Sequence, residues 1–164
     1  MLKGLGLHAY GLDCQQYAQW YDHPKRKPKE IIPFCEYQSL FSVADITDEC
    51  GVSCCEHGNA WPSDIVICRE VLEHLTIREV RQAVANLCRL SSKFVYVTTR
   101  FAQPPTSLLS VDTYDDLDPT HITMLNQDFL RTLFVLEGCR RRADLEAALD
   151  WQGKGRVLVY EVLQ

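Results

Sequence analysis

Two carboxylates and an imidazole lie close together near the middle of the chain, in the pattern Glu70-x-x-Glu73-His74. On a helix, positions i, i+3 and i+4 share one face, so these three side chains can reach a common point. A second imidazole, His121, follows later in the chain. Carboxylate oxygens and imidazole nitrogens together suit a divalent ion such as magnesium, manganese or zinc. Glu70, Glu73, His74 and His121 are therefore candidate metal ligands.

The same residues also have an interpretation without a metal. Glu73 and His74 can cap and pack the start of a helix, while His121 alone can act as a base or a hydrogen-bonding group beside an acceptor. In either case Glu70, His74 and His121 are the candidate catalytic residues. The residue types leave both alternatives open.

A second cluster, Cys50, Cys54, Cys55 and His57, offers sulfur and imidazole ligands for zinc. Structural zinc sites usually pair a short cysteine knuckle with a second, distant pair, and Cys35 is the one distant candidate. We therefore expect incidental loop thiols here. The chain starts without a signal-peptide pattern, so its eight cysteines are expected to be reduced thiols in a soluble, cytoplasmic protein.

Short apolar runs alternate with longer amphipathic stretches, which is the pattern of an α/β fold with a mostly parallel sheet. The first two expected strands, 8–12 and 40–44, each end on an acid, Asp13 and Asp45. The third, 64–68, is nearly all apolar, as a strand covered on both faces should be. Asp13, Asp45 and Glu70 therefore lie at the carboxyl ends of the expected strands, where open α/β sheets bind their ligands.

The second half of the chain supplies the helices. Thr76 and Glu79 are spaced as a capping box at the start of a helix over 76–90, and a strand over 93–99 follows. Next come a long connection over 100–119, a helix over 127–137 capped by Asn126 and ended by Gly138, and two closing strands within 139–164 joined through Gly153, Lys154 and Gly155.

The segment from Asp64 to Leu75, which reads DIVICREVLEHL, resembles the fourth strand and following helix start of class I S-adenosylmethionine-dependent methyltransferases of the small-molecule type. The tail, with Gly138-Cys139 and Val157–Glu161, resembles the final antiparallel hairpin of that family. The resemblance covers nearly the whole chain. It implies a Rossmann-like sandwich with the strand order 3-2-1-4-5-7-6, and methyl transfer from S-adenosylmethionine to an oxygen or nitrogen of a small molecule or a polymer end.

The resemblance also assigns roles to residues. It implies that Asp13 binds the ribose hydroxyls of the cofactor, that Asp45 lies by the adenine amino group, and that Arg69 lies with Glu70 at the methyl-transfer cleft. The alternative is that both aspartates only end strands and start turns. The Glu-His pattern resembles the metal site of small-RNA 2′-O-methyltransferases and ubiquinone-pathway O-methyltransferases, although it also occurs in relatives that have no metal.

One part of the family pattern has no counterpart in the sequence. The glycine-rich turn lies about 20 residues before the acid that takes the ribose, but Asp13 follows a G-x-G, Gly4 and Gly6, too closely for that role. We therefore expect residues 1–164 to form one N-terminally incomplete domain without the first strand. A second copy of the chain completing the sheet, and a non-catalytic, partner-binding module, are the alternatives that follow.

The composition limits the partners. With 46% hydrophobic residues the chain can bury a core, and its formal net charge of −5 does not indicate a nucleic-acid partner. Local basic clusters occur at 25–29 and 140–142. No apolar run approaches the ~18 residues that a bilayer-spanning helix needs, so we expect no membrane partner.

Overall fold

The computed structural model describes residues 11–13, 41–43, 45–48, 62–102, 109–110 and 120–163. The chain divides into two compact units, Met1–Asn59 and Ala60–Gln164. The proposed cysteine loop, with Cys35, Cys50, Cys54, Cys55 and His57, lies outside the described residues. The organisation of the chain as one domain, and its incomplete N-terminus, stay predictions.

The smaller unit contains two short parallel strands, β1 (Gly11–Asp13) and β2 (Phe41–Val43). They pair in register, so that Asp13 lies opposite Val43. Both fall at the expected places, although Asp13 is the last residue of its strand rather than the residue after it. Because the strands are parallel, Asp13 and the turn containing Asp45 follow the carboxyl ends of neighbouring strands.

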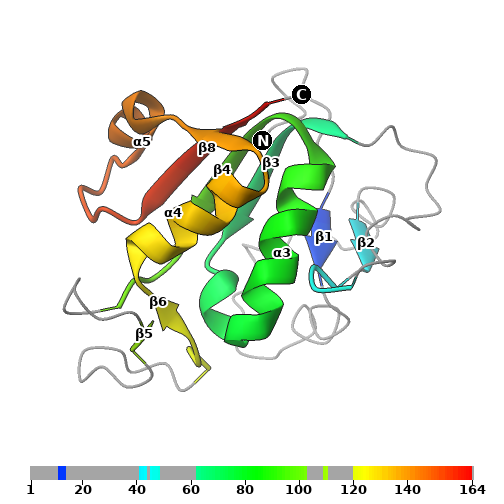
Figure 1. Cartoon of the computed structure of the whole chain (residues 1–164), viewed down its shortest axis with the longest axis vertical. Coiled ribbons are helices and arrows are strands. Elements are labelled where there is room, and N and C mark those ends of the chain that lie inside the picture. Colours follow the sequence, from blue (N-terminus) through cyan, green and yellow to red (C-terminus); the bar gives the residue numbers. More distant parts are fainter. Residues whose placement is uncertain are drawn as a thin grey trace, which may run out of the picture. The chain divides into compact units, whose positions relative to one another are not determined.

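The larger unit is built on a four-stranded sheet with the order β3 (Ser63–Arg69), β4 (Ser91–Thr98), β8 (Val157–Val162) and β7 (Cys139–Arg141). The strands β3 and β4 are parallel, whereas β8 is antiparallel to both of its neighbours (Figure 1). This order corresponds to positions 4-5-7-6 of the expected sheet. The predicted α/β fold with a C-terminal antiparallel pair is confirmed.

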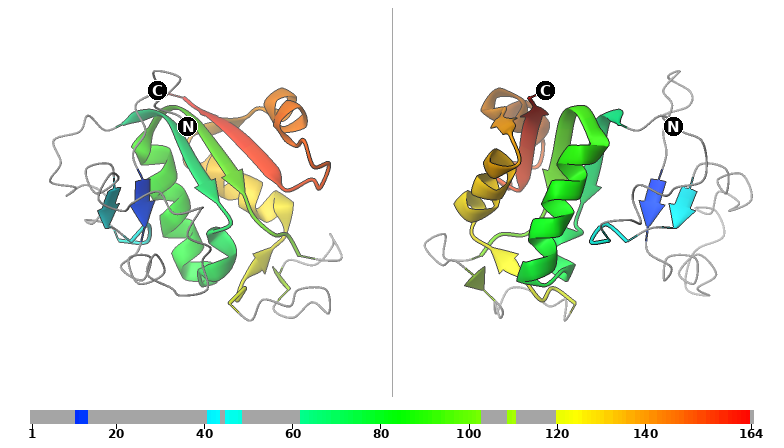
Figure 2. Two further views of the ribbon diagram at one scale, coloured as in Figure 1. Left: turned by 180° about the vertical axis from the view of Figure 1, so that it is seen from behind. Right: turned by 45° about the vertical axis from the view of Figure 1, so that its right-hand side comes forward.

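Two helices, α3 (Ile77–Leu90) and α4 (Gln127–Leu136), lie side by side on one face of this sheet (Figures 1 and 2). The predicted capping box is present, because the Thr76 hydroxyl accepts from Glu79 N–H and the Glu79 carboxylate accepts from Thr76 N–H. Asn126 caps α4 as predicted, by accepting from the first N–H groups of that helix. Within the described residues, no helix combines the length and apolarity needed to cross a bilayer.

The core lies between these helices and the sheet. The face of α3 that the sequence predicts to be apolar is buried, including Val80 and Val84. The Phe134 ring of α4 stacks on the Tyr160 ring of β8 with 4.2 Å between ring centroids, and both side chains are fully buried. Offset or stacked aromatic pairs of this kind add to the burial of apolar area, so α4 is fixed firmly over β8.

The sequence-based prediction lacks one helix and one pair of short strands. A helix, α5 (Ala143–Leu149), separates β7 from β8, so the tail is not a simple hairpin. Its alanine, leucine and glutamate residues are strong helix formers, and Asp150 ends it by accepting from the backbone N–H groups of Lys154 and Gly155. A short antiparallel pair, β5 (Leu109–Ser110) with β6 (Met124–Leu125), joins the long connection to the sequence before α4.

Within the larger unit, described by itself, the third strand is covered on one face, whereas its apolar sequence predicts cover on both faces. In β3, Cys68 is 6% exposed, but Ile65 and Ile67 are 56% and 59% exposed. The helices α3 and α4 cover the face to which Cys68 belongs, and β3 is an edge strand among the described residues of its unit. Alternate residues of a strand point to opposite faces, which accounts for the difference. Pairing of a second copy with this edge stays a prediction.

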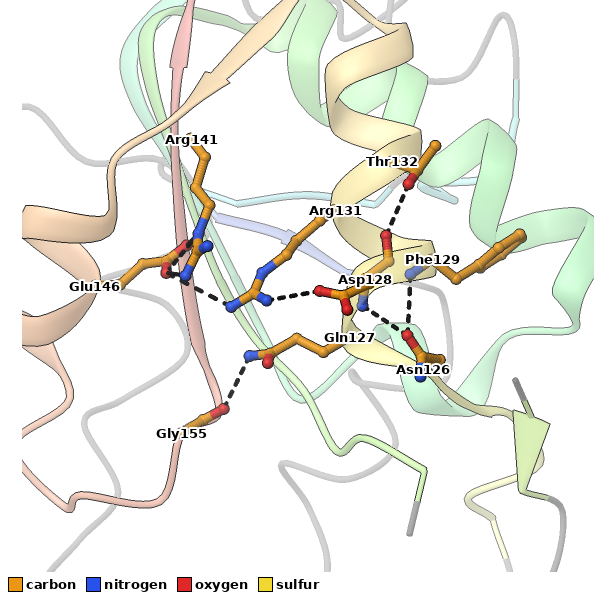
Figure 3. A network of polar contacts seen from close by, with 9 residues as sticks. All are labelled: Asn126, Gln127, Asp128, Phe129, Arg131, Thr132, Arg141, Glu146 and Gly155. Atoms are coloured by element: carbon orange, nitrogen blue, oxygen red, sulfur yellow. Dashed lines mark hydrogen bonds and ion pairs between the residues drawn. The ribbon is translucent and has the colours of Figure 1, made fainter. Parts of the chain in front are cut away.

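A polar network joins α4 to the C-terminal elements (Figure 3). Arg131 of α4 contacts Asp128 at 2.8 Å and lies 3.9 Å from Glu146, which also binds Arg141. The neighbouring Arg140 and Arg142 pair with Glu161 and Asp144. The basic cluster at 140–142 is therefore neutralised by acids of its own unit.

Candidate functional site

A strained turn follows β3. Glu70 has a φ of 51°, in the left-handed region that residues other than glycine rarely adopt, and its N–H donates to the Thr98 carbonyl at 2.8 Å. Such a conformation costs on the order of 1–3 kcal/mol and is common at functional sites. The turn leads into a 3-10 helix, η4 (Leu72–His74). The expectation that Glu70, Glu73 and His74 share one α-helical face is therefore wrong, because Glu70 lies before the helix.

Glu73 is the buried acid of the site, with a relative exposure of 0%. Its Oε2 accepts a hydrogen bond from the Thr99 hydroxyl at 2.8 Å, while its Oε1 is buried and has no hydrogen-bond partner among the described residues. Burial raises the pKa of this carboxyl, and the nearby charge of the Glu70 carboxylate raises it further. A buried polar atom without a partner is costly, so Oε1 indicates a place for a ligand.

The two imidazoles lie beside this acid. The ring centroids of His74 and His121 are 4.8 Å apart, and the rings are tilted by 60°. His74 Nδ1 lies 3.1 Å from the Thr120 carbonyl oxygen, and the Thr123 N–H donates to the Glu73 carbonyl. A carbonyl oxygen can only accept a hydrogen bond, so Nδ1 of His74 donates to it. In the neutral imidazole the other ring nitrogen, Nε2, then carries the lone pair. The segment before β6 thus holds His121 next to His74 of η4.

The ligand atoms of Glu73, His74 and His121 all lie within 4.8 Å of one another. One carboxylate and two imidazoles form the donor set of open catalytic metal sites, in which three protein ligands leave a position for water or substrate. The unpartnered Oε1 is the atom that such an ion would satisfy. The residues present therefore fit a divalent ion, and Glu70 lies outside this compact group of three.

The candidate cofactor residues occupy the ends of strands. Asp13 ends β1 and Arg69 ends β3, while Asp45 begins the turn after β2. Asp45 Oδ1 accepts from the N–H and the hydroxyl of Thr47, at 2.8 and 2.7 Å. Asp45 therefore stabilises a turn, as the alternative interpretation of the sequence expects.

Sequence reasoning missed two residues that hold the site together. Thr99 binds the buried carboxylate of Glu73, and Thr120 binds His74 through its backbone carbonyl. The position of Thr99 directly after β4, beside the strand that leads to Glu70, was the available signal. A backbone carbonyl gives no signal in a residue type, so the role of Thr120 required the structure.

No family model and no curated protein matches the chain in sequence. In structure it is similar to an O-methyltransferase family protein from Burkholderia thailandensis, with a TM-score of 0.56, 12% identity, and 92% of this chain and 42% of that chain covered. Human N-acetylserotonin methyltransferase, solved in complex with SAM, gives a TM-score of 0.54 and 10% identity over 93% of this chain and 40% of that chain.

The glycopeptide N-methyltransferase MtfA, also complexed with SAM, is similar with a TM-score of 0.53 and 9% identity over 98% of this chain and 74% of that chain. The chain thus spans less than half the length of the first two proteins. At these identities the similarity establishes the fold, and the activities are those of the other proteins.

Proposed function

We propose that this chain takes part in methyl transfer from S-adenosylmethionine to an oxygen or nitrogen of a small molecule or a polymer end. It has the fold of class I S-adenosylmethionine-dependent methyltransferases. The observation that carries the proposal is the group of Glu73, His74 and His121, which gathers at the carboxyl end of β3 around an unpartnered buried oxygen. Ligands of open α/β sheets bind outside the carboxyl ends of the strands.

Methyl transfer from a sulfonium is an in-line displacement, so holding the acceptor close and aligned supplies most of the rate. Glu73, His74 and His121 would hold a divalent ion, which when bound orients an acceptor hydroxyl and lowers its pKa. The Thr120 carbonyl fixes the ring of His74, and the Thr99 hydroxyl fixes the carboxylate of Glu73. Glu70, whose carboxylate raises the pKa of Glu73, is exposed and lies outside this group of three.

The proposed cofactor site is formed by residues at the carboxyl ends of strands. Asp13 would bind the ribose hydroxyls, because a carboxylate offers two acceptor oxygens to a diol. Asp45 would lie by the adenine amino group and Arg69 at the methyl-transfer cleft. What supports this assignment is that each follows or ends a strand at its carboxyl end.

Manganese binding tests the metal part. Free Mn²⁺ gives a sharp electron paramagnetic resonance signal that fades on binding, so titration of the chain with Mn²⁺ alone gives an affinity without any acceptor. We expect His74→Ala and His121→Ala to abolish saturable binding, and the exposed Glu137→Gln to leave it unchanged. Equal Mn²⁺ affinity in all of these variants would mean that His74 and His121 do not form a metal site.

Calorimetric titration with S-adenosylhomocysteine tests the cofactor part. Because the sequence shows no glycine-rich turn, we expect the 164-residue chain to bind more weakly than micromolar, and Asp13→Ala to weaken binding further. Asp64→Ala is the matched control, since Asp64 lies near the amino end of β3, where it pairs with the exposed Lys93 and accepts a hydrogen bond from the Ser92 hydroxyl. Micromolar affinity would contradict the need for the turn.

Methyl transfer itself is measured by the release of S-adenosylhomocysteine from S-adenosylmethionine in the presence of a pool of phenols, catechols and amines. We expect product only with some of these acceptors, and none with His121→Ala. A chain that binds neither Mn²⁺ nor cofactor and releases no product would instead be a non-catalytic, partner-binding module with this fold.

A further inference from the structure

Two cysteines from different elements meet in the core of the larger unit. Cys88 lies near the end of α3 and Cys139 starts β7, and their sulfur atoms are 3.1 Å apart although the residues are 51 positions apart in sequence. Both are free thiols, 6% and 4% exposed. A disulfide has an S–S distance of about 2.05 Å, so an approach of roughly 1 Å would close the bond.

We propose that Cys88 and Cys139 form a dithiol site that hydrogen peroxide oxidises to an intramolecular disulfide, which links α3 covalently to β7. This site is separate from Glu73, His74 and His121, and it does not depend on the proposed methyl transfer.

A small oxidant has a route to this pair. A hollow of about 290 Å³ reaches Cys88 from the surface. Since one water molecule takes about 30 Å³ in the liquid, this volume admits a peroxide as far as Cys88, whose sulfur lies 3.1 Å from that of Cys139. The hollow is lined by Gln82, Ala85, Cys88, Arg89, Glu137 and Val162.

The contact between the two sulfurs also prepares them for reaction. The hydrogen bond that they share lowers the pKa of the Cys139 thiol, and it raises the pKa of the Cys88 thiol together with burial. Cys139 is thus the sulfur that more readily becomes a thiolate, which is the nucleophilic form. Cys88 keeps the proton and remains beside it.

The reaction balances with one peroxide. The Cys139 thiolate attacks one peroxide oxygen, the O–O bond breaks, and a sulfenic acid and hydroxide form. The sulfur of Cys88 then attacks the sulfur of Cys139 and displaces the second oxygen as hydroxide, while the two thiol protons convert both hydroxides to water. The two sulfurs lose two electrons and the peroxide gains them.

Cys68 is the internal contrast. It is also a buried free thiol, but no hydrogen bond joins it to a second cysteine among the described residues, so it has no neighbouring thiol with which to condense. We therefore expect Cys68 to remain reduced under conditions that join the other two.

Peptide mapping of the full chain tests the proposal without any substitution. Reduced protein is treated with hydrogen peroxide, quenched in acid, alkylated with N-ethylmaleimide in guanidinium and cut with trypsin without reductant. Cleavage after Arg81, Arg89, Arg131 and Arg140 gives the peptides 82–89 and 132–140, each with a single cysteine. We expect these two joined, lighter by two hydrogens than their sum, and Cys68 alkylated. Alkylated 82–89 and 132–140 peptides after peroxide would overturn the proposal.

Thermal unfolding provides a second measurement. A disulfide between residues 51 positions apart restricts the unfolded chain. We therefore expect the disulfide to raise Tm by about 5–15 °C. Cys88→Ala should lose the peroxide-dependent rise, and Cys68→Ala should keep it. The same Tm before and after peroxide, or a rise that survives in Cys88→Ala, would contradict the link between α3 and β7.

Discussion

The hydroxyl of Thr99 donates a hydrogen bond to Oε2 of Glu73 at 2.8 Å, and both residues are buried. The preceding residue, Thr98, is also buried, but its hydroxyl has no hydrogen-bond partner in the described part of the chain. Of these two neighbouring threonines, only Thr99 has a hydroxyl that holds the candidate metal ligand.

We expect Thr99→Val to weaken Mn²⁺ binding by about 10- to 100-fold, the loss typical of groups that orient a metal ligand. The substitution keeps the shape of the side chain and removes only the hydroxyl. Thr98→Val is the matched control and should bind Mn²⁺ as the unchanged chain does. If both variants lose affinity equally, the effect comes from packing near β4 and not from the bond to Glu73.

The pH at which Mn²⁺ binding is half lost should shift in the same variant. A metal ligand must be deprotonated, so affinity falls as pH drops through the raised pKa of Glu73. The bond from Thr99 lowers that pKa, and its loss should move the midpoint to higher pH. Titrations of Thr99→Val and Thr98→Val at several pH values would show this. The same pH midpoint in both variants would mean that Thr99 only positions the carboxylate of Glu73 and does not change its pKa.

The stability of the metal-free chain should also depend on Glu73. Because burial raises the pKa of this carboxyl in the folded chain, the folded state keeps a proton that the unfolded state loses above about pH 4.5. The contribution of Glu73 is therefore greatest at low pH and declines as pH rises towards the folded pKa. Urea unfolding in the presence of a chelator should show the free energy of unfolding falling relative to Glu73→Gln over this range. A constant difference between the two proteins would contradict it.

Local signals in the sequence predicted the parts of the fold that depend on neighbouring residues. The capping box of Thr76 and Glu79 and the cap at Asn126 are short-range patterns, and both helices start where these patterns place them. The helix α5 was missed because the glycines after it suggested a hairpin turn, although its own residues favour a helix. The exposed face of β3 was missed because an apolar strand looks alike whether one or both faces are covered.

The candidate site was predictable only as a set of residue types. The sequence placed Glu73, His74 and His121 together through spacing and resemblance, and the structure brings them within 4.8 Å. The sequence did not predict that Glu70 lies in a strained turn outside the group of Glu73, His74 and His121. The hydrogen bonds from Thr99 and to the Thr120 carbonyl depend on contacts between β4, η4 and the segment before β6, and such long-range contacts leave no periodic pattern.

The two faces of the sheet should differ in their tolerance to truncation. Leu158 of β8 is fully buried, and Leu158→Ala should lower the free energy of unfolding by about 2–5 kcal/mol because it leaves a cavity. Ile67 of β3 is 59% exposed, so Ile67→Ala should cost less than about 1 kcal/mol. Urea unfolding of both variants measures the contrast. Costs of similar size would show that a further segment or copy covers Ile67 in solution.

The acid at the centre of the C-terminal network should matter more than the acids around it (Figure 3). Glu146 is 7% exposed, binds Arg141 at 2.6 Å and accepts from the N–H of Val159 at 3.3 Å. We expect Glu146→Gln to cost about 2–3 kcal/mol, because it removes a charge from partly buried arginines that remain in place.

Asp144→Asn is the control for Glu146→Gln. Asp144 also binds an arginine, Arg142, at 2.7 Å, but its side chain is 62% exposed, so water screens the pair and the substitution should cost much less stability than Glu146→Gln. Added salt should reduce the small effect of Asp144→Asn and leave most of the effect of Glu146→Gln, since buried pairs are screened less. Equal costs and equal salt dependence would mean that Glu146 behaves as a surface acid and that α5 is held to β8 by its apolar contacts.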